Sequence, residues 1–301
     1  MIEVLTPGPF TTVQDSGRIG WAHLGVPVAG PADWLSHLLA NRLVGNRDGA
    51  AALEVTAAGP TLWVDRDTAV AVVGASLQVD DEPAPTGRTV LVPAGSRATV
   101  GGTDDVRAYL AVAGGIDVPP VLGSRSADTL SGLGPGPLAA GDVLAVAPAD
   151  LPPVWMLDRH ALPQRRDALR VIAGPHADWF TEQARRAFAG GSYDVSPSSD
   201  RVGVRLDGPR LARSREGELP TEGMATGALQ VPPDGAPILL LANHGATGGY
   251  PVIGVVVRAD LPAAGQLRPG ATVQFTVVER DQAVAAYLDL RAAADRAVVV
   301  G

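Results

Sequence analysis

The sequence predicts a mainly β protein with a few helices, arranged as two similar lobes. Short apolar runs bounded by turn residues recur along the chain, among them TVLVPAG, DVLAVAP, VRLDGP and TVQFTVVE. The 36 glycines and 26 prolines are scattered between such runs, which is typical of short strands joined by tight turns. No succession of strand, helix and strand is visible, so we do not expect a fold built from βαβ units.

Helical periodicity is limited to three segments. Residues 34–45, 178–190 and 281–296 carry apolar side chains at helical spacing. In the first of them the leucines share one face, and Gly45 follows where the helix can end. We expect helices in these three places.

The length favours two domains, because 301 residues exceed the usual size of one. Between residues 151 and 167 the apolar alternation is lost and prolines and charges gather, which predicts a linker. We therefore expect a first β lobe over residues 1–150 and a second β lobe over residues 168–301, the second ending in a helix.

A short pattern recurs in the two halves and favours similar lobes. Arg18 is followed by Ile and Gly, and Arg201 by Val and Gly. An aspartate precedes each arginine, Asp15 in the first half and Asp200 in the second. A pattern this short also arises by chance.

Composition excludes several classes of function. The chain has no lysine, and therefore no lysine for a P-loop, a Schiff base or biotin attachment. It has no cysteine, which excludes thiol catalysis and agrees with a reducing compartment. The net charge of -8 argues against nucleic acid as a partner. No leader-like start and no apolar run of ~20 residues is present, so we expect a cytoplasmic protein that does not enter a membrane.

Polar side chains gather against glycines in three regions. These are TVQDSGRIGWAHLGVPVAGPAD, LGSRSADTL, and the stretch that contains SSDRVGVRLDGP, TEGMATGALQ and NHGATGGYP. Glycine lets the backbone approach a ligand, arginine offers a planar fork to an anion, and aspartate accepts protons. This mixture is typical of a site for a small polar substrate that is anionic or carries an amide.

Each feature also has a simpler interpretation. Asp15 and Arg18 are equally typical of a surface ion pair worth ~0–1 kcal/mol, and Arg125 beside its serines of a turn cap. GATGGYP has the composition of a hairpin turn between PILLLA and VIGVVV. The five histidines have no metal-ligand spacing, so no metal is expected.

Six segments in order resemble one known family. They are TVQDSGRIGWAHLGVPVAGPAD, LANRLVGNRDGAAALEVTAAGP, VLGSRSADTL, SDRVGVRLDGP, TEGMATGALQVPPDGAPILLLA and TGGYPVIGVV. Together they resemble the KipA family of 5-oxoprolinase subunits, also called allophanate hydrolase subunit 2. That family is similar to part of the carboxyltransferase domain of urea carboxylase.

The resemblance implies a cyclophilin-like β-barrel architecture and an obligate KipI-like partner. In the 5-oxoprolinase assembly a LamB/YcsF-type protein joins these two, and the complex uses ATP to convert 5-oxo-L-proline into L-glutamate. In urea carboxylase the related domain moves a carboxyl group to an amide nitrogen from carboxybiotin, which another chain would bring here. In both cases the substrate is a small amide or lactam.

The family motifs fall on particular residues of this chain. Asp33 ends a segment usually written S-G-A-M-D, in which alanines replace the serine and the methionine here. Asn243 stands where the family has an aspartate, and a neutral amide cannot serve as a base. The other matched positions are Gln14, Asp15, Gly17, Arg18, Ser124, Arg125, Ser126, Ser199, Asp200, Arg201, His244, Thr247, Gly248, Gly249 and Tyr250.

We predict catalytic roles for four residues. Asp15 would orient or deprotonate the amide, and Arg18 and Arg125 would hold an anionic group. The fourth is Thr247. The Thr247 side chain, with the N–H groups of the two following glycines, would cradle an oxyanion. We predict substrate contacts for Gln14, Asp33, Ser124, Ser126, Asp200, Arg201, His244, Gly248, Gly249 and Tyr250.

Three functions fit these observations. The first is a working part of an ATP-dependent 5-oxoprolinase complex. The second is a component of a biotin-dependent carboxyltransferase that acts on urea or another amide. The third is a non-catalytic protein that binds and antagonises a KipI-like kinase inhibitor.

Overall fold

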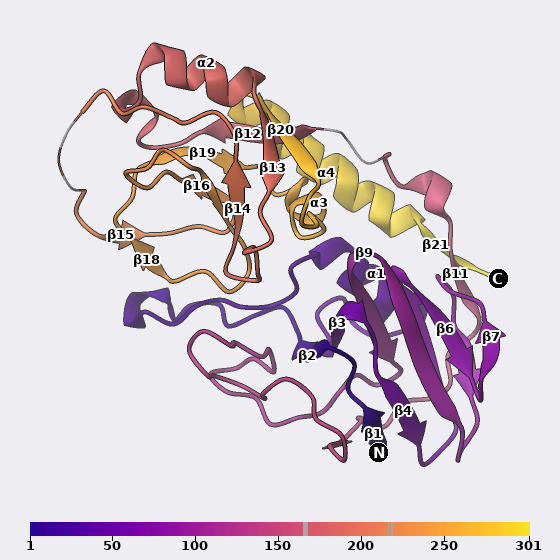
Figure 1. The fold of residues 1–301 in the computed structure, drawn as a ribbon. Coiled ribbons are helices and arrows are strands. Elements are labelled where there is room, and N and C mark those ends of the chain that lie inside the picture. The colour runs from indigo at the N-terminus through magenta and orange to yellow at the C-terminus, as the bar shows by residue number, and fades with distance from the viewer. Residues whose placement is uncertain (165–167, 216, 218) are drawn as a thin grey trace. The chain divides into compact units, whose positions relative to one another are not determined.

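The structure is a computed structural model that describes residues 1–164, 168–215, 217 and 219–301 (Figure 1). Strands dominate the described residues, which confirms the predicted mainly β fold class. The chain divides into two compact units. Unit 1 contains Met1–Arg18, Ala29–Leu162 and Ala293–Gly301, and unit 2 contains Ile19–Val28 and Pro163–Ala292.

Unit 1 is built on a ten-stranded sheet. Its strands are β1 (Ile2–Thr6), β2 (Phe10–Gln14), β3 (Ala52–Ala58), β4 (Thr61–Val64), β5 (Thr68–Val73), β6 (Ala75–Val79), β7 (Glu82–Ala84), β8 (Val90–Val92), β9 (Arg97–Val112) and β10 (Val143–Leu144). The long strand β9 pairs antiparallel with β3, β4, β5 and β6, so it joins most of the sheet. The main path through the sheet runs β10-β1-β4-β9-β3-β2.

Both faces of the central strands are buried. In β9, Ala108 and Leu110 belong to one apolar core, and the alternate residues Tyr109 and Ala111 belong to a second core on the opposite face. Successive side chains of a strand point to opposite faces. This explains why these strands read as continuous apolar runs rather than as alternating ones.

The helix α1 (Trp34–Leu43) covers the second of these cores with Leu38, Leu39 and Leu43. Its N-cap is Asp33, whose Oδ1 accepts a hydrogen bond from the N–H of Ser36. The chain leaves the helix before Gly45, as predicted. In the same unit β11 (Trp155–Leu157) pairs antiparallel with β21 (Val298–Val300).

Unit 2 is a closed seven-stranded barrel. In order around the barrel its strands are β12 (Ala168–Ala173), β19 (Val252–Val256), β16 (Ala228–Gln230), β17 (Ile238–Leu240), β14 (Gly203–Asp207), β13 (Ser192–Val195) and β20 (Thr272–Val277). A parallel pairing between β20 and β12 closes it. Alternate residues of each strand, such as Tyr193 and Val195, form its core.

Three helices follow strands of the barrel: α2 (Glu182–Gly190), α3 (Leu261–Ala264) and α4 (Arg280–Arg296). Phe188 of α2 stacks on Phe275 of β20, with ring centroids 5.0 Å apart. The predicted helices correspond to α1, α2 and α4, whereas the single turn of α3 was not predicted. None of the described helices combines the length and the apolar character needed to cross a bilayer.

The segment between β17 and β19 does not form the hairpin that its glycines allow. β17 pairs with β14 and β16, and β19 pairs with β12 and β16. The intervening strand β18 (Thr247–Gly248) pairs instead with β15 (Glu222–Gly223) in a separate two-stranded ribbon. The hairpin interpretation is therefore wrong, because each flanking strand has other partners.

The segment predicted as a linker, residues 151–167, contains regular structure. It includes β11 and a short 3-10 helix, Arg159–Ala161. Its last three residues, 165–167, lie outside the described residues.

Candidate functional site

Asp15 follows β2 directly and lies against the segment 124–126. Its Oδ1 accepts hydrogen bonds from the hydroxyls of Ser124 (2.5 Å) and Ser126 (2.7 Å) and from the N–H of Gly17 (2.9 Å). Its Oδ2 accepts one from the N–H of Arg125 (2.6 Å). The fold thus joins two predicted motifs that are far apart in the sequence, and four donors surround one carboxylate.

These donors determine the charge of Asp15. Burial raises the pKa of the carboxyl, but the hydrogen bonds from Ser124, Arg125, Ser126 and Gly17 favour the ionised form and leave the pKa below its usual value. A carboxylate that titrates at low pH and already accepts four hydrogen bonds is a weak base. The geometry favours a role in holding segment 124–126 over deprotonation of a substrate.

Arg18 is completely buried beneath the same segment. Its Nε donates to the carbonyl of Val121 (3.0 Å), and its Nη2 donates to the carbonyl of Ser126 (2.5 Å). Burial lowers the pKa of the guanidinium, and the charges of Asp128 and Asp15 oppose that effect. A side chain with no exposed surface does not meet a dissolved anion, so this geometry favours bracing of the loop.

Arg125 is more accessible than Arg18. Its side chain is 27% exposed, and its Nη2 lies 2.5 Å from Oδ1 of Asp117. An ion pair with a half-exposed aspartate is worth only ~0–1 kcal/mol, so an anionic ligand can compete with Asp117. Of the two arginines predicted to hold an anion, Arg125 has the suitable geometry.

Gln14 and Asp33 both have structural partners. The Gln14 side chain donates to the carbonyl of Ala127 (3.2 Å), and its own backbone carbonyl lies 3.0 Å from Nε2 of His37. Asp33 caps α1, as described above. These contacts fix the start of the helix and the end of β2 rather than point to a substrate.

A buried carboxylate and phenol hold the segment before α1. The Tyr109 hydroxyl donates to Oε2 of Glu54 (2.7 Å) and accepts from the N–H of Asp33 (2.8 Å). Oε2 of Glu54 also accepts from the N–H of Ala32 (2.9 Å). We did not predict a site role for Glu54 or Tyr109. The available signal was a polar residue inside an apolar strand run.

In unit 2 the predicted residue Arg201 contacts Asn243, which directly precedes the predicted residue His244. Nη2 of Arg201 donates to Oδ1 of Asn243 (3.2 Å), and the N–H of Asn243 donates to the carbonyl of Arg201 (2.9 Å). All three side chains are buried. Asp200, which is exposed, accepts from the N–H of Val202 (2.7 Å) and so stabilises the turn.

His244 contacts a residue that we did not predict. Its Nε2 lies 3.1 Å from Oγ1 of Thr226, and its Nδ1 lies 2.7 Å from the carbonyl oxygen of Gly245. Burial lowers the pKa of the imidazole, and the contact with Gly245 partly opposes that effect. The ring is therefore neutral near pH 7. Thr226 was missed because a single threonine in a polar loop has no distinctive sequence signal.

The remaining predicted residues lie along the β15/β18 ribbon or just beyond it. Thr247, Gly249 and Tyr250 are exposed. A Cβ at Gly248 would lie 2.4 Å from Nε2 of Gln230, so this glycine allows close packing. These positions are available to a ligand, and their roles stay predictions.

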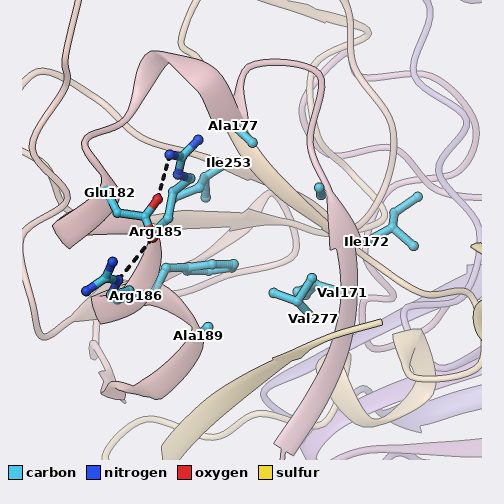
Figure 2. A pocket seen from close by; sticks show the side chains of 11 residues that line it. Val171, Ile172, Ala177, Glu182, Arg185, Arg186, Ala189, Ile253 and Val277 are labelled. Atoms are coloured by element: carbon cyan, nitrogen blue, oxygen red, sulfur yellow. Dashed lines mark hydrogen bonds and ion pairs between the residues drawn. The ribbon is translucent and has the colours of Figure 1, made fainter. Parts of the chain in front are cut away.

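A separate hollow in unit 2 contains none of the predicted residues. It has a volume of about 330 Å³ and lies beside α2, with a lining that includes Val171, Ile253 and Val277 (Figure 2). Arg185 and Arg186 at its rim are both paired with Glu182, at 2.6 Å and 3.0 Å. These charged groups at the rim therefore already have partners.

Comparison with known proteins identifies the family of the chain. Residues 24–277 match the family described as carboxyltransferase domain, subdomain A and B. The chain belongs to this family. It is 35% identical to a protein of Escherichia coli that is named as one of the subunits of 5-oxoprolinase, over 96% of this chain and 95% of that protein.

The chain also matches parts of much longer proteins. The chain is 34% identical to the urea amidolyase of Saccharomyces cerevisiae, over 91% of this chain but 16% of that protein. The crystal structure of the K. lactis urea amidolyase matches 98% of this chain and 20% of that one, with 33% identity and a TM-score of 0.91. The fold is therefore that of a carboxyltransferase domain.

Proposed function

We propose that this chain is part of an ATP-dependent 5-oxoprolinase complex that converts 5-oxo-L-proline into L-glutamate, together with a KipI-like protein and a LamB/YcsF-type protein. The observation that carries the proposal is the match to a named component of 5-oxoprolinase across 95% of that protein's length. Two urea amidolyases match over a similar share of this chain, but that match spans only 17% and 16% of their own length.

The chemistry of the site is consistent with a small lactam that bears a carboxylate. Arg125 has a partly exposed guanidinium whose present partner, Asp117, is displaceable. The Asp15 carboxylate accepts hydrogen bonds from the backbone of Arg125 and from the neighbouring Ser126 hydroxyl. Because the chain has no lysine, it has no P-loop lysine, and we assign the nucleotide to a partner chain.

A second candidate is carboxyl transfer to urea or another amide, with carboxybiotin brought by a partner. The family description and the urea amidolyase relatives support it. Both candidate reactions use an unreactive amide or lactam as substrate. They differ in the co-substrate that the partner chains bring.

A reconstitution experiment separates the two candidates. The chain would be purified with its candidate KipI-like and LamB/YcsF-type partners, and ATP hydrolysis and glutamate release would be followed with 5-oxoproline as substrate. We expect both signals in the full mixture and neither when any one chain is omitted. A well-formed complex that is inactive on 5-oxoproline but carboxylates urea when biotin carboxylase and a biotinylated carrier are added would favour the second candidate.

A further inference from the structure

The segments around β15 and β18 run antiparallel beyond the strands themselves. Glu222 pairs with Gly248 and Gly223 with Thr247, and the N–H of Met224 donates to the carbonyl of Ala246 (2.9 Å). Each step forward on one segment matches one step back on the other. Thr226 and His244 lie just beyond this ribbon, Thr226 in a turn, and the contact between their side chains joins the two segments there.

The partners of His244 define its tautomer. The carbonyl of Gly245 can only accept a hydrogen bond, so Nδ1 of His244 carries the hydrogen in the 2.7 Å contact. In a neutral ring Nε2 is then an acceptor, and the Thr226 hydroxyl donates to it across 3.1 Å. A buried imidazole oriented by one group and facing a hydroxyl with its other nitrogen is the arrangement of an acid–base pair.

Thr226 is more exposed to solvent than His244. His244 is 5% exposed, whereas Thr226 is only partly buried and its neighbour Ala225 is exposed. Among the residues that the structure describes, His244 is the only hydrogen-bond partner of the Thr226 hydroxyl. Its oxygen therefore has lone pairs available for a donor from outside. An amide or lactam N–H is such a donor.

We propose that Thr226 and His244 form a proton-accepting pair for an amide substrate, in which Thr226 is the catalytic residue and His244 acts through it. The inference rests on the proposed function, since both candidate substrates carry an amide N–H. In the step, the substrate N–H bond breaks and its proton goes to Oγ1 of Thr226. The original hydroxyl proton passes to Nε2 of His244. The substrate nitrogen keeps the electron pair, the hydroxyl is restored, and the imidazole becomes an imidazolium.

The pair Thr226→Val and Thr226→Ser tests the step in the complete complex. Valine keeps the shape but removes the hydroxyl, and we expect kcat to fall roughly 10²-fold or more with KM little changed. Serine restores the hydroxyl and should retain most of the rate. Thr272→Val is the matched control, because its exposed hydroxyl contacts only Asp194 among the described residues and should leave the rate unchanged.

NMR titration of the full chain tests the hydrogen bond from Thr226 to His244 independently of activity. The His244 resonance is assigned by its loss in His244→Gln. A hydrogen bond donated to Nε2 stabilises the neutral ring, so this resonance should titrate at higher pH in Thr226→Val than in the wild type.

The outcomes separate the pair from the proposed function. Full kcat for Thr226→Val in an active complex, or an unchanged His244 titration, would overturn the pair alone. A wild-type complex that acts on neither 5-oxoproline nor urea would overturn the proposed function, and with it the catalytic role that the pair takes from that function.

Discussion

Oδ1 of Asp15 lies 2.5 Å from the Ser124 hydroxyl, although 109 residues separate them in the chain. Together with Ser126 and the backbone of Arg125, this contact makes Asp15 the anchor of segment 124–126.

Asp15→Asn should destabilise unit 1. The amide keeps the shape but replaces an acceptor oxygen by an NH₂ group that faces donors, and it removes the charge that strengthens four hydrogen bonds. We expect a loss of roughly 2–3 kcal/mol in the free energy of unfolding, measured by urea denaturation. Asp117→Asn is the control, because its half-exposed ion pair should contribute ~0–1 kcal/mol. Equal effects of the two variants would contradict the anchor role.

The stability contributed by Asp15 should depend on pH with a definite sign. The pKa of Asp15 is lowered in the folded state, so its contribution is complete above the unfolded value of about 3.9. It is lost as the pH falls through the lowered folded value. The difference in unfolding free energy between the wild type and Asp15→Asn should therefore be largest near neutral pH and shrink below about pH 4. A difference that is constant or grows in acid would refute this assignment.

Tyr109→Phe should destabilise the segment before α1. The substitution removes the hydroxyl that bridges Glu54 and the N–H of Asp33, and it leaves buried polar groups without that partner. We expect a cost of about 1–3 kcal/mol in thermal or urea unfolding. Tyr250→Phe, at an exposed tyrosine, should cost almost nothing.

Gly134→Ala should be far more costly than Gly132→Ala. Both glycines have positive φ, 79° and 70°, so an alanine at either is strained by about 1–2 kcal/mol. At Gly134 the new Cβ would also lie 2.2 Å from the Ser126 carbonyl oxygen and 2.9 Å from Nη2 of Arg18, whereas at Gly132 it meets nothing within 4 Å. The difference in unfolding free energy between these two variants measures the crowding around Arg18. Similar values would mean that the loop relaxes easily.

Arg125→Met should reduce activity without unfolding the protein. Its ion pair with Asp117 is partly exposed and contributes little to stability. If Arg125 holds the substrate carboxylate, kcat/KM of the complex should fall roughly 10- to 100-fold, which corresponds to about 1.4–2.8 kcal/mol. Arg97→Met, which breaks an exposed pair with Asp81, should leave kcat/KM unchanged. A normal kcat/KM for Arg125→Met would remove Arg125 from the site.

Local patterns predicted the mainly β class and the helices α1, α2 and α4. They did not predict which strands pair, because pairing depends on partners far away in the chain. The GATGGYP segment shows this, since its composition is that of a hairpin turn while β17 and β19 pair with other strands. The repeated pattern at Asp15 and Asp200 did report on local structure. Both side chains accept a hydrogen bond from the N–H two residues later.

The composition of the site was easier to predict than the roles of its residues. Asp15, Ser124, Arg125 and Ser126 are brought together, but spacing alone could not show that Asp15 would be saturated with donors. The burial of Arg18 could not be predicted either, because the residue type does not distinguish a buried arginine from an exposed one that binds an anion. Thr226 belongs to no recognisable sequence pattern, and only the structure reveals its contact with His244.

Glutamate release from 5-oxoproline and ATP by the reconstituted complex, measured with and without this chain, tests most directly whether the chain is a working part of a 5-oxoprolinase. We expect release that requires this chain and both partners, and that falls in Thr226→Val but not in Thr226→Ser. Release at the same rate when this chain is left out would contradict the claim that it is a working part of a 5-oxoprolinase.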